Sequence, residues 1–260
     1  MKIPFYKYQG TGNDFVILDN RSGLFNQLTK ETIFNLCHRR KGIGADGLMM
    51  LNNHESSDFE MLYFNADGLP GSMCGNGGRC MVQFAHDLGI KRYTYRFFAV
   101  DGEHVAEIDQ QGNVKLKMIA VSVVLKQNGY AILDTGSPHF VKWVHDIENV
   151  DVFQSGMEIR YSKPFAEKGI NVNFVEVLED NLIFVRTYER GVEDETMSCG
   201  TGVTACALMA AHNQLGFNQI EVKTTGGQLS VEFERIDEQH FVNIWLCGPA
   251  IKVFQGEIDL

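Results

Sequence analysis

Residues 72–80 read Ser-Met-Cys-Gly-Asn-Gly-Gly-Arg-Cys, and the rest of the chain is best understood outward from them. Cys74 stands directly before a glycine-rich turn, and a mostly apolar segment follows that turn. The same arrangement returns at residues 198–205, which read Ser-Cys-Gly-Thr-Gly-Val-Thr-Ala around Cys199. We interpret both segments as helix N-termini, each with a cysteine at its start.

The chain repeats itself at an offset of about 125 residues. Phe15-Val16 falls on Phe140-Val141, and Cys74-Gly75 falls on Cys199-Gly200. Phe15 precedes Cys74 by 59 residues, and Phe140 precedes Cys199 by the same 59. Matches at one offset indicate a duplicated unit, and this period is far too long for a solenoid. We therefore expect two similar lobes, formed by residues 1–118 with 250–260 and by residues 119–249.

Each predicted lobe places short strands around one helix. The first helix follows Cys74 and ends at Gly89, and the second runs from Thr201 to Leu215. The second is apolar nearly all round and the first mostly so, which is typical of helices buried on every side. Thr29 is expected to cap a further helix that runs toward residue 40. The predicted strands cover residues 3–8, 15–19, 48–51, 59–65, 93–99, 104–108, 114–118, 130–133, 140–144, 171–178, 182–188, 220–223, 228–233, 241–246 and 251–254.

These elements predict a mixed α/β (α+β) fold with two pseudo-symmetric lobes. Each lobe is expected to be a curved, mostly antiparallel sheet wrapped around a buried central helix, with the active site in the cleft between the lobes. The net charge of −10 and the absence of a Lys/Arg cluster argue against a nucleic-acid partner. No segment resembles a secretion signal or a membrane span, so we expect a cytoplasmic protein with no membrane partner.

The six cysteines do not predict a metal site. No pair has C-x-x-C spacing, and the eight histidines are scattered along the chain. We expect neither a bound metal nor a cofactor. Cys37, Cys80, Cys206 and Cys247 are interpreted as small buried apolar residues.

Cys74 and Cys199 have a chemical reason to differ from the other four. A helix N-terminus presents unpaired N–H groups and a partial positive charge, which lower the pKa of a thiol and can hold an anion. Two such thiols on opposite sides of a substrate suit the inversion of a carbon that bears a weakly acidic hydrogen. One sulfur removes the proton from one face, and the other supplies a proton to the opposite face.

The sequence resembles the diaminopimelate epimerase family over the whole chain. The resemblance rests on residues 64–68 (Phe-Asn-Ala-Asp-Gly), the block around Cys74, residues 188–191 (Tyr-Glu-Arg-Gly) and residues 195–202 around Cys199. Residues 10–15 and 137–139 agree with it. It implies a two-lobed enzyme that needs no pyridoxal phosphate and interconverts LL- and meso-diaminopimelate for lysine and peptidoglycan synthesis. It also suggests a homodimer.

The resemblance implies a role for each matching residue. Cys74 and Cys199 are the acid/base pair, and His139 and Glu189 support proton transfer. The substrate-binding residues that carry over are Asn13, Asn65, Gly75, Asn76, Asn171, Glu189, Arg190, Gly200 and Thr201. Arg190 can hold a carboxylate in bidentate fashion. Three positions depart from the common family pattern. Some members have Gln after the Asp of the early glycine-rich strand, whereas Gly47 follows Asp46 here, so we assign no substrate contact there. Ser137 replaces an Asn, so we expect a shorter or water-bridged contact there, and Gly78 replaces an Ala, which loosens the first helix turn.

Several other functions remain open from the residues. Proline racemase usually has His where this chain has Asn76, and the phenazine-type isomerases have a carboxylate where it has Cys74. A thiol redox protein that uses Cys74 and Cys199 is a different class, but a redox role does not require Arg190 or Asn65. A non-catalytic amino-acid-binding protein would keep its binding after the loss of either cysteine.

Overall fold

The computed structural model describes residues 2–211 and 214–259 of the chain. Two compact units form, Met1–Leu116 with Gly248–Leu260 and Lys117–Cys247, which we call unit 1 and unit 2. Their junctions, at 116/117 and 247/248, each lie two residues before the lobe boundaries drawn from the sequence. The chain therefore leaves unit 1, builds unit 2 and returns to unit 1 with its last strand.

Unit 1 is one sheet with two helices. Its strands follow the spatial order β17-β1-β2-β3-β4-β5-β6-β7. The pairs β2–β3 and β4–β5 are parallel, and the other neighbours are antiparallel. The elements are β1 (Lys2–Gly10), β2 (Asn13–Asp19), α1 (Lys30–Cys37), β3 (Gly47–Asn52), β4 (Phe59–Asn65), α2 (Gly75–Asp87), β5 (Thr94–Ala99), β6 (Gly102–Ile108), β7 (Val114–Lys117) and β17 (Ile251–Asp259).

Unit 2 has the same plan. Its strands follow the order β8-β9-β10-β11-β12-β14-β15-β16, with β10–β11 and β12–β14 parallel. The short β13 pairs with the end of β12. The elements are β8 (Val124–Gln127), β9 (Tyr130–Asp134), β10 (Pro138–Trp143), the 3₁₀ helix η1 (Ile147–Asn149), α3 (Val152–Arg160), β11 (Asn171–Glu179), β12 (Leu182–Glu189), β13 (Asp194–Thr196), α4 (Gly200–Ala210), β14 (Gly216–Thr224), β15 (Gly227–Arg235) and β16 (Phe241–Gly248).

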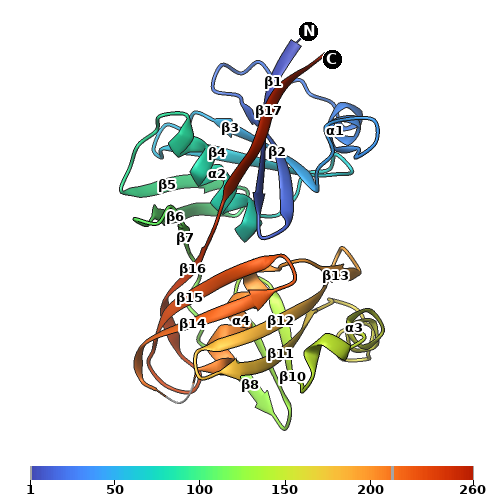
Figure 1. Cartoon of the computed structure of the whole chain (residues 1–260), viewed down its shortest axis with the longest axis vertical. Coiled ribbons are helices and arrows are strands. Elements are labelled where there is room, and N and C mark those ends of the chain that lie inside the picture. Colours follow the sequence, from blue (N-terminus) through green and yellow to red (C-terminus); the bar gives the residue numbers. More distant parts are fainter. Residues whose placement is uncertain (1, 212–213, 260) are drawn as a thin grey trace. The chain divides into compact units, whose positions relative to one another are not determined.

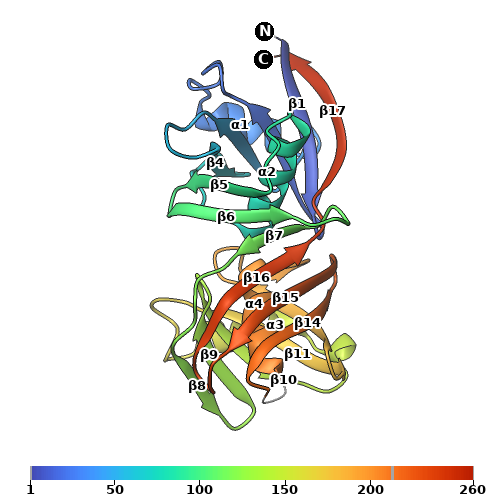
Figure 2. The same cartoon turned by 90° about the vertical axis from the view of Figure 1, so that its left-hand side faces the viewer.

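The duplication expected from the sequence is therefore present in the topology. Strand by strand, β17-β1-β2-β3-β4-β5-β6-β7 corresponds to β8-β9-β10-β11-β12-β14-β15-β16, with parallel pairs at the same two places. The last strand of the chain, β17, pairs with β1 as β8 pairs with β9. Figure 2 shows β1 and β17 side by side. Unit 1 thus uses the last strand of the chain, β17, at the place where unit 2 uses β8, the strand that directly precedes β9 in the sequence.

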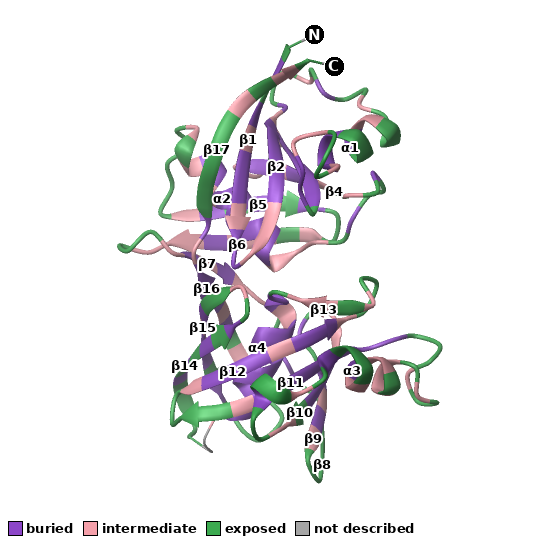
Figure 3. Cartoon of the chain, turned by 45° about the vertical axis from the view of Figure 1, so that its right-hand side comes forward, coloured by how far each residue is buried: buried purple, intermediate pink, exposed green. Residues whose placement is uncertain are grey.

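Each sheet wraps around one central helix, as predicted. Helix α2 contacts β1, β2, β3, β4, β6 and β17, and α4 contacts β9, β10, β11, β12, β14 and β15, so five strands of each set correspond. All of α4 except Thr201 is buried, as Figure 3 shows. Val203, Cys206 and Leu208 of this helix pack with strand residues such as Val141 and Val231 in one apolar core. None of the described helices has the length and apolar character needed to cross a membrane.

A second helix covers the outer face of each sheet. Ile33 and Leu36 of α1 pack with Val16 and Leu18 of β2. The alternate residue, Phe15, lies against α2 near Gly77. Side chains of a strand alternate between the two faces, so β2 is covered on both and its residues Phe15–Leu18 are all buried. The protein therefore builds each unit as helix, sheet and central helix (Figure 1).

Three local expectations are corrected. Helix α4 ends at Ala210 and not at Leu215. The carbonyl of Ala211, which would accept from Leu215 N in a longer helix, accepts from Arg235 Nη1 at 3.4 Å. Residues 212–213 of the predicted helix lie outside the described residues. Helix α1 has the predicted Thr29 cap but ends at Cys37, short of residue 40.

Helix α3 was missed, and the sequence only indicated a weak segment there. Gly156 stands in the middle of this helix, where glycine is unfavourable. The reason for the glycine is tertiary packing, since an added Cβ would lie 2.4 Å from Tyr188 Cβ of β12. A local preference against helix is thus overridden by a close approach between helix and sheet.

Candidate active site

Cys74 and Cys199 occupy the same position in the two units. Each is the N-cap of the central helix, with extended backbone angles of φ −115°, ψ 125° at Cys74 and φ −111°, ψ 110° at Cys199. The Cys74 carbonyl accepts from Gly78 N at 2.7 Å, and the Cys199 carbonyl accepts from Val203 N at 2.8 Å. Both predicted helix starts are therefore found, and both thiols lie at the positive end of a buried helix.

Cys74 lies beside Asn13 of β2. Cys74 Sγ lies 3.5 Å from Asn13 Oδ1, and Asn13 Nδ2 donates to Asp46 Oδ2 at 2.7 Å. Arg39 bridges Asp46 and Asp14, at 2.6 and 2.7 Å. The structure thus brings Asn13 and Cys74 together and adds Asp46 behind them.

Asn76 takes part in a buried hydrogen-bond network of unit 1. It is 1% exposed, and its Oδ1 accepts from Arg79 Nη2 at 3.0 Å. Arg79 is fully buried one turn into α2 and also donates to Thr11 Oγ1 at 3.3 Å. This network ties the β1–β2 turn to the start of α2. Asn76 also has a backbone N–H in the first turn of the helix, where such groups can bind a ligand.

Asn65 lies at the end of β4 and is exposed. Its backbone N–H donates to the carbonyl of Leu69 at 2.9 Å, which closes the 66–69 turn. An added Cβ at Gly71 would lie 3.0 Å from Asn65 Oδ1, so Gly71 leaves room for this side chain.

Cys199 is 8% exposed and lies beside Thr201 in the first turn of α4. Cys199 Sγ and Thr201 Oγ1 lie 3.5 Å apart. Thr135, directly after β9, donates to the Thr201 carbonyl at 2.8 Å. The loop between β9 and β10 is thereby fastened to the first turn of α4, which carries the thiol.

Ser137, Asn171 and Arg190 form one polar cluster. Asn171 Nδ2 donates to Ser137 Oγ at 2.9 Å, and Asn171 Oδ1 accepts from Arg190 N at 2.8 Å. Arg190 Nη2 also donates to Ser137 Oγ at 3.3 Å, and its Nη1 donates to Lys168 O at 3.1 Å. The serine in place of the usual family Asn is thus held by two of the predicted binding residues. Next to them, Glu189 accepts from Thr196 Oγ1 at 2.9 Å.

His139 is fully buried in β10 and is held by a residue that the sequence did not indicate. Its Nδ1 lies 3.0 Å from Asn173 Nδ2. Burial lowers the His139 pKa to about 3, and the positive charge of Arg190 acts in the same direction. The imidazole is therefore neutral at physiological pH.

A comparison with known protein families shows to which family the chain belongs. The family model described as diaminopimelate epimerase matches residues 5–124 and 131–253. The chain belongs to the diaminopimelate epimerase family.

Individual relatives of the family agree. The diaminopimelate epimerase of Flavobacterium psychrophilum is 47% identical over 98% of this chain and 100% of its own length. That of Aquifex aeolicus is 38% identical over 99% and 98%. Among solved structures, a phenazine biosynthesis protein of Bacillus anthracis aligns over 100% of both chains with a TM-score of 0.75 at 15% identity. A probable proline racemase of Agrobacterium radiobacter aligns over 99% of this chain and 93% of its own with a TM-score of 0.66 at 13% identity. These structures share the fold.

The other cysteines of this family member are structural. Cys37, Cys80, Cys206 and Cys247 are at most 5% exposed, as predicted. Burial raises the pKa of Cys37 and of Cys80 to about 12 and raises that of Cys206 well above its usual value. These three groups are thiols at neutral pH, so the reactive thiolate of an epimerase has to come from elsewhere.

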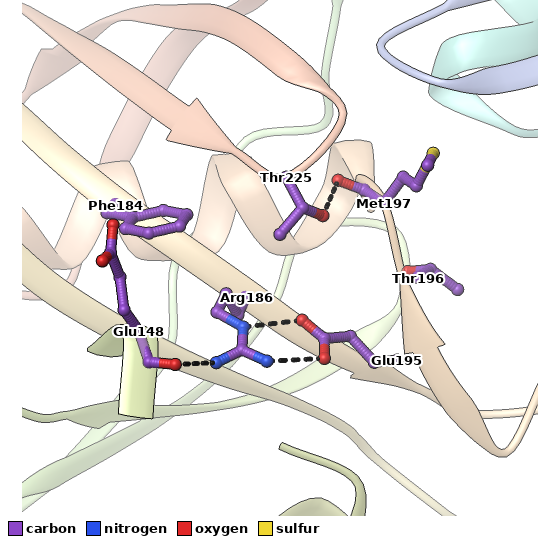
Figure 4. A pocket seen from close by; sticks show the side chains of 7 residues that line it. All are labelled: Glu148, Phe184, Arg186, Glu195, Thr196, Met197 and Thr225. Atoms are coloured by element: carbon purple, nitrogen blue, oxygen red, sulfur yellow. Dashed lines mark hydrogen bonds and ion pairs between the residues drawn. The ribbon is translucent and has the colours of Figure 1, made fainter. Parts of the chain in front are cut away.

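A surface pocket of unit 2 lies beside the strand that leads to Cys199 but contains none of the predicted site residues. It is lined by Glu148, Phe184, Arg186, Glu195, Thr196, Met197 and Thr225. Figure 4 shows Arg186 at its centre, with two bonds to the Glu195 carboxylate at 2.7 and 2.8 Å and one to the Glu148 carbonyl at 3.3 Å. Arg186 also donates to the carbonyls of Ile147 and Val150, at 2.8 and 2.9 Å. The Arg186 cation thereby connects β13, which ends three residues before Cys199, to β12 and η1.

Proposed function

We propose that this protein is a cofactor-independent amino-acid epimerase that interconverts LL-2,6-diaminopimelate and meso-diaminopimelate in lysine biosynthesis. Membership of the diaminopimelate epimerase family supports this function. The observation that carries the mechanism is the matched geometry of Cys74 and Cys199, each the N-cap of a buried central helix. Within a duplicated fold, this is the arrangement expected of two equivalent bases.

The reaction needs one thiolate and one thiol. The thiolate takes the α-hydrogen as a proton, and the electron pair of that C–H bond passes toward the adjacent carboxylate. The thiol of the other cysteine then gives its proton to the opposite face of the same carbon, and its own electron pair stays on sulfur. One thiol is formed and one is consumed, so the enzyme returns to an equivalent state and can run in either direction.

The remaining predicted residues bind the substrate in this proposal. The first-turn N–H groups of α2 and α4, at Gly75-Asn76 and Gly200-Thr201, stabilise the charge that develops on the carboxylate. The far end of the substrate carries its own carboxylate and amine. Asn13, Asn65, Asn171 and Arg190 are suited to hold those groups, and Glu189 and His139 act near the reacting carbon.

The proposal also covers the oligomeric state, the cellular location and the binding partners of the protein. We propose a homodimer in the cytoplasm that binds no nucleic acid. The net charge of −10 supports the last point. The dimer is supported by β17, which pairs with β1 and lies on the outer side of it in Figure 2. Ile251, Val253 and Phe254 of this strand are about half exposed, at 49, 53 and 46%, an exposed apolar edge of the kind that pairs with another chain.

The test is to incubate the reduced protein with LL-diaminopimelate, without added cofactor or metal, and to separate the stereoisomers by chiral chromatography. Formation of meso-diaminopimelate is expected for the wild type. Replacement of either catalytic thiol, by Cys74→Ala or Cys199→Ala, should abolish it. Activity that survives either replacement would exclude the two-thiol mechanism, and inactivity of the wild type at high substrate concentration would exclude the function itself.

A further inference from the structure

His139 Nδ1 faces a group that can only donate to it. Asn173 Nδ2 lies 3.0 Å from Nδ1, and the same amide nitrogen lies 3.1 Å from the carbonyl oxygen of Phe140. A carbonyl oxygen is an acceptor and never a donor. The Asn173 amide therefore has to present its NH₂ group to this side, and a flipped amide would set two oxygens against each other.

The other end of the Asn173 amide is fixed as well. Its Oδ1 accepts from Thr187 Oγ1 at 2.9 Å, and both residues are buried, with Asn173 0% and Thr187 2% exposed. Since Asn173 Nδ2 donates to the ring, His139 Nδ1 is an acceptor and carries no hydrogen. A neutral imidazole has one N–H, so the hydrogen resides on Nε2.

The protonated edge of the His139 ring lies beside the helix turn that carries Cys199. Among the described residues, Nε2 has no hydrogen-bond partner, although it is buried. The ring atom bonded to it, Cε1, lies 3.4 Å from the place where a Cβ of Gly202 would be, in the first turn of α4. That same Cβ would lie only 2.3 Å from Asn173 Oδ1. Gly202 thus makes room for the Asn173–His139 pair at the start of this helix.

We propose that Asn173 is a positioning residue that holds His139 as the neutral Nε2–H tautomer, so that His139 serves the reaction as a fixed hydrogen-bond donor and not as a base. The tautomer follows from the contacts of Asn173 alone. Only one part of the inference rests on the proposed function, namely that an anionic group of the reaction accepts this hydrogen bond. A buried donor of fixed direction stabilises developing negative charge without the cost of reorganising solvent. Arg190 is the charged group that acts on His139 electrostatically, and it opposes protonation of the ring.

The tautomer can be read directly by NMR on protein labelled with ¹⁵N-histidine. The His139 signals are assigned by their loss in His139→Gln. We expect an unprotonated Nδ1 and a protonated Nε2 that do not change between about pH 5 and pH 8. A protonated Nδ1 in the wild type, or a ring that titrates within this range, would overturn the inference.

Substitutions of Asn173 and Thr187, the two residues that position His139, test the effect on catalysis. Asn173→Asp offers an acceptor to Nδ1, so the hydrogen should move to Nδ1, and loss of the donor should lower kcat about 100-fold with a much smaller change in KM. Thr187→Val, which is milder, removes the bond that orients Asn173 and should lower kcat about tenfold, while Thr187→Ser keeps the hydroxyl and should retain wild-type kcat.

The experiments distinguish a failure of the proposed epimerase function from a failure of the positioning role of Asn173. The NMR assignment does not depend on turnover, so a wild type without epimerase activity would overturn the proposed function. An active enzyme whose tautomer and kcat are unchanged in Asn173→Asp and Thr187→Val would overturn the positioning role.

Discussion

Asn13 donates through Nδ2 to Asp46 Oδ2 at 2.7 Å, and its carbonyl oxygen lies 3.5 Å from Cys74 Sγ. A carboxylate accepts hydrogen bonds and cannot donate them, so Asp46 determines which end of the Asn13 amide faces the thiol. Asp46 was not assigned from the sequence, yet it fixes the orientation of a residue that the family resemblance places against the substrate.

The first prediction concerns Asp46→Asn. An amide at position 46 can donate or accept, so Asn13 gains a second orientation, and we expect kcat/KM to fall about tenfold. The matched control is Arg39→Gln, which removes the ion pairs to Asp14 and Asp46 but leaves the Asn13–Asp46 bond. Its kcat/KM should stay within about twofold of wild type. Equal losses in the two variants would show that the ion-pair cluster, and not the amide orientation, is what matters.

The second prediction compares two glycines at the same place in the duplicated helices. An added Cβ at Gly202 would lie 2.3 Å from Asn173 Oδ1, whereas at Gly77 it would lie 3.1 Å from the flexible Met49 Sδ. Gly202→Ala should therefore cost about 2 kcal/mol of unfolding free energy. Gly77→Ala should cost less than about 1 kcal/mol, because the gain in helix propensity offsets the contact. Urea denaturation of both variants measures this, and a Gly77→Ala loss as large as that of Gly202→Ala would contradict it.

The topology was predictable because the duplication is visible in the residues. The matching of Phe15 with Phe140 and of Cys74 with Cys199 predicted two equivalent central helices, and the apolar character of residues 203–210 predicted burial. Helix α3 was not predictable in this way, since Gly156 reflects contact with Tyr188 and not local preference.

The supporting residues of the site were missed for a related reason. Asp46 acts on Asn13 from 33 positions away, and Asn173 acts on His139 from 34. An Asn or Asp near a strand end has many uses, and nothing in its neighbours along the chain tells which one applies. The available signal was the register of paired strands, which places residue 173 of β11 beside β10.

The third prediction concerns Arg186, which ties β13 to β12 and η1. Its side chain is 16% exposed, so Arg186→Met breaks a mostly buried ion pair and leaves several carbonyls without a donor. We expect a loss of about 2 kcal/mol of unfolding free energy. Arg96→Ala removes an ion pair of similar length, 2.8 Å to Glu103, between side chains that are 59 and 43% exposed. That control should change stability by less than about 0.5 kcal/mol. A larger effect at Arg96 than at Arg186 would refute this account of the strand anchor.

The fourth prediction concerns acid stability. Burial raises the pKa of the Asp14 carboxyl, but hydrogen bonds from Arg39 and Lys7 outweigh that effect and hold it at about 2, below the usual 3.8. A depressed pKa contributes stability that is present above the unfolded-state value and is lost as the pH falls from about 4 toward 2. Asp14→Asn should therefore be less stable than wild type at neutral pH, with a difference that narrows below about pH 4. A gap in urea midpoint that stays constant from neutral to acidic pH would contradict the assignment.

The central claim is that Cys74 and Cys199 act as two separate bases on one carbon. It is tested most directly by running the reaction on LL-diaminopimelate in deuterium oxide and analysing product and recovered substrate at low conversion. The account predicts one deuterium at the inverted α-carbon of the meso product and almost none in the recovered substrate, because the thiol that removes a proton is not the one that delivers the deuterium. Recovered substrate labelled as fast as product would contradict it, since a single base would then serve both faces.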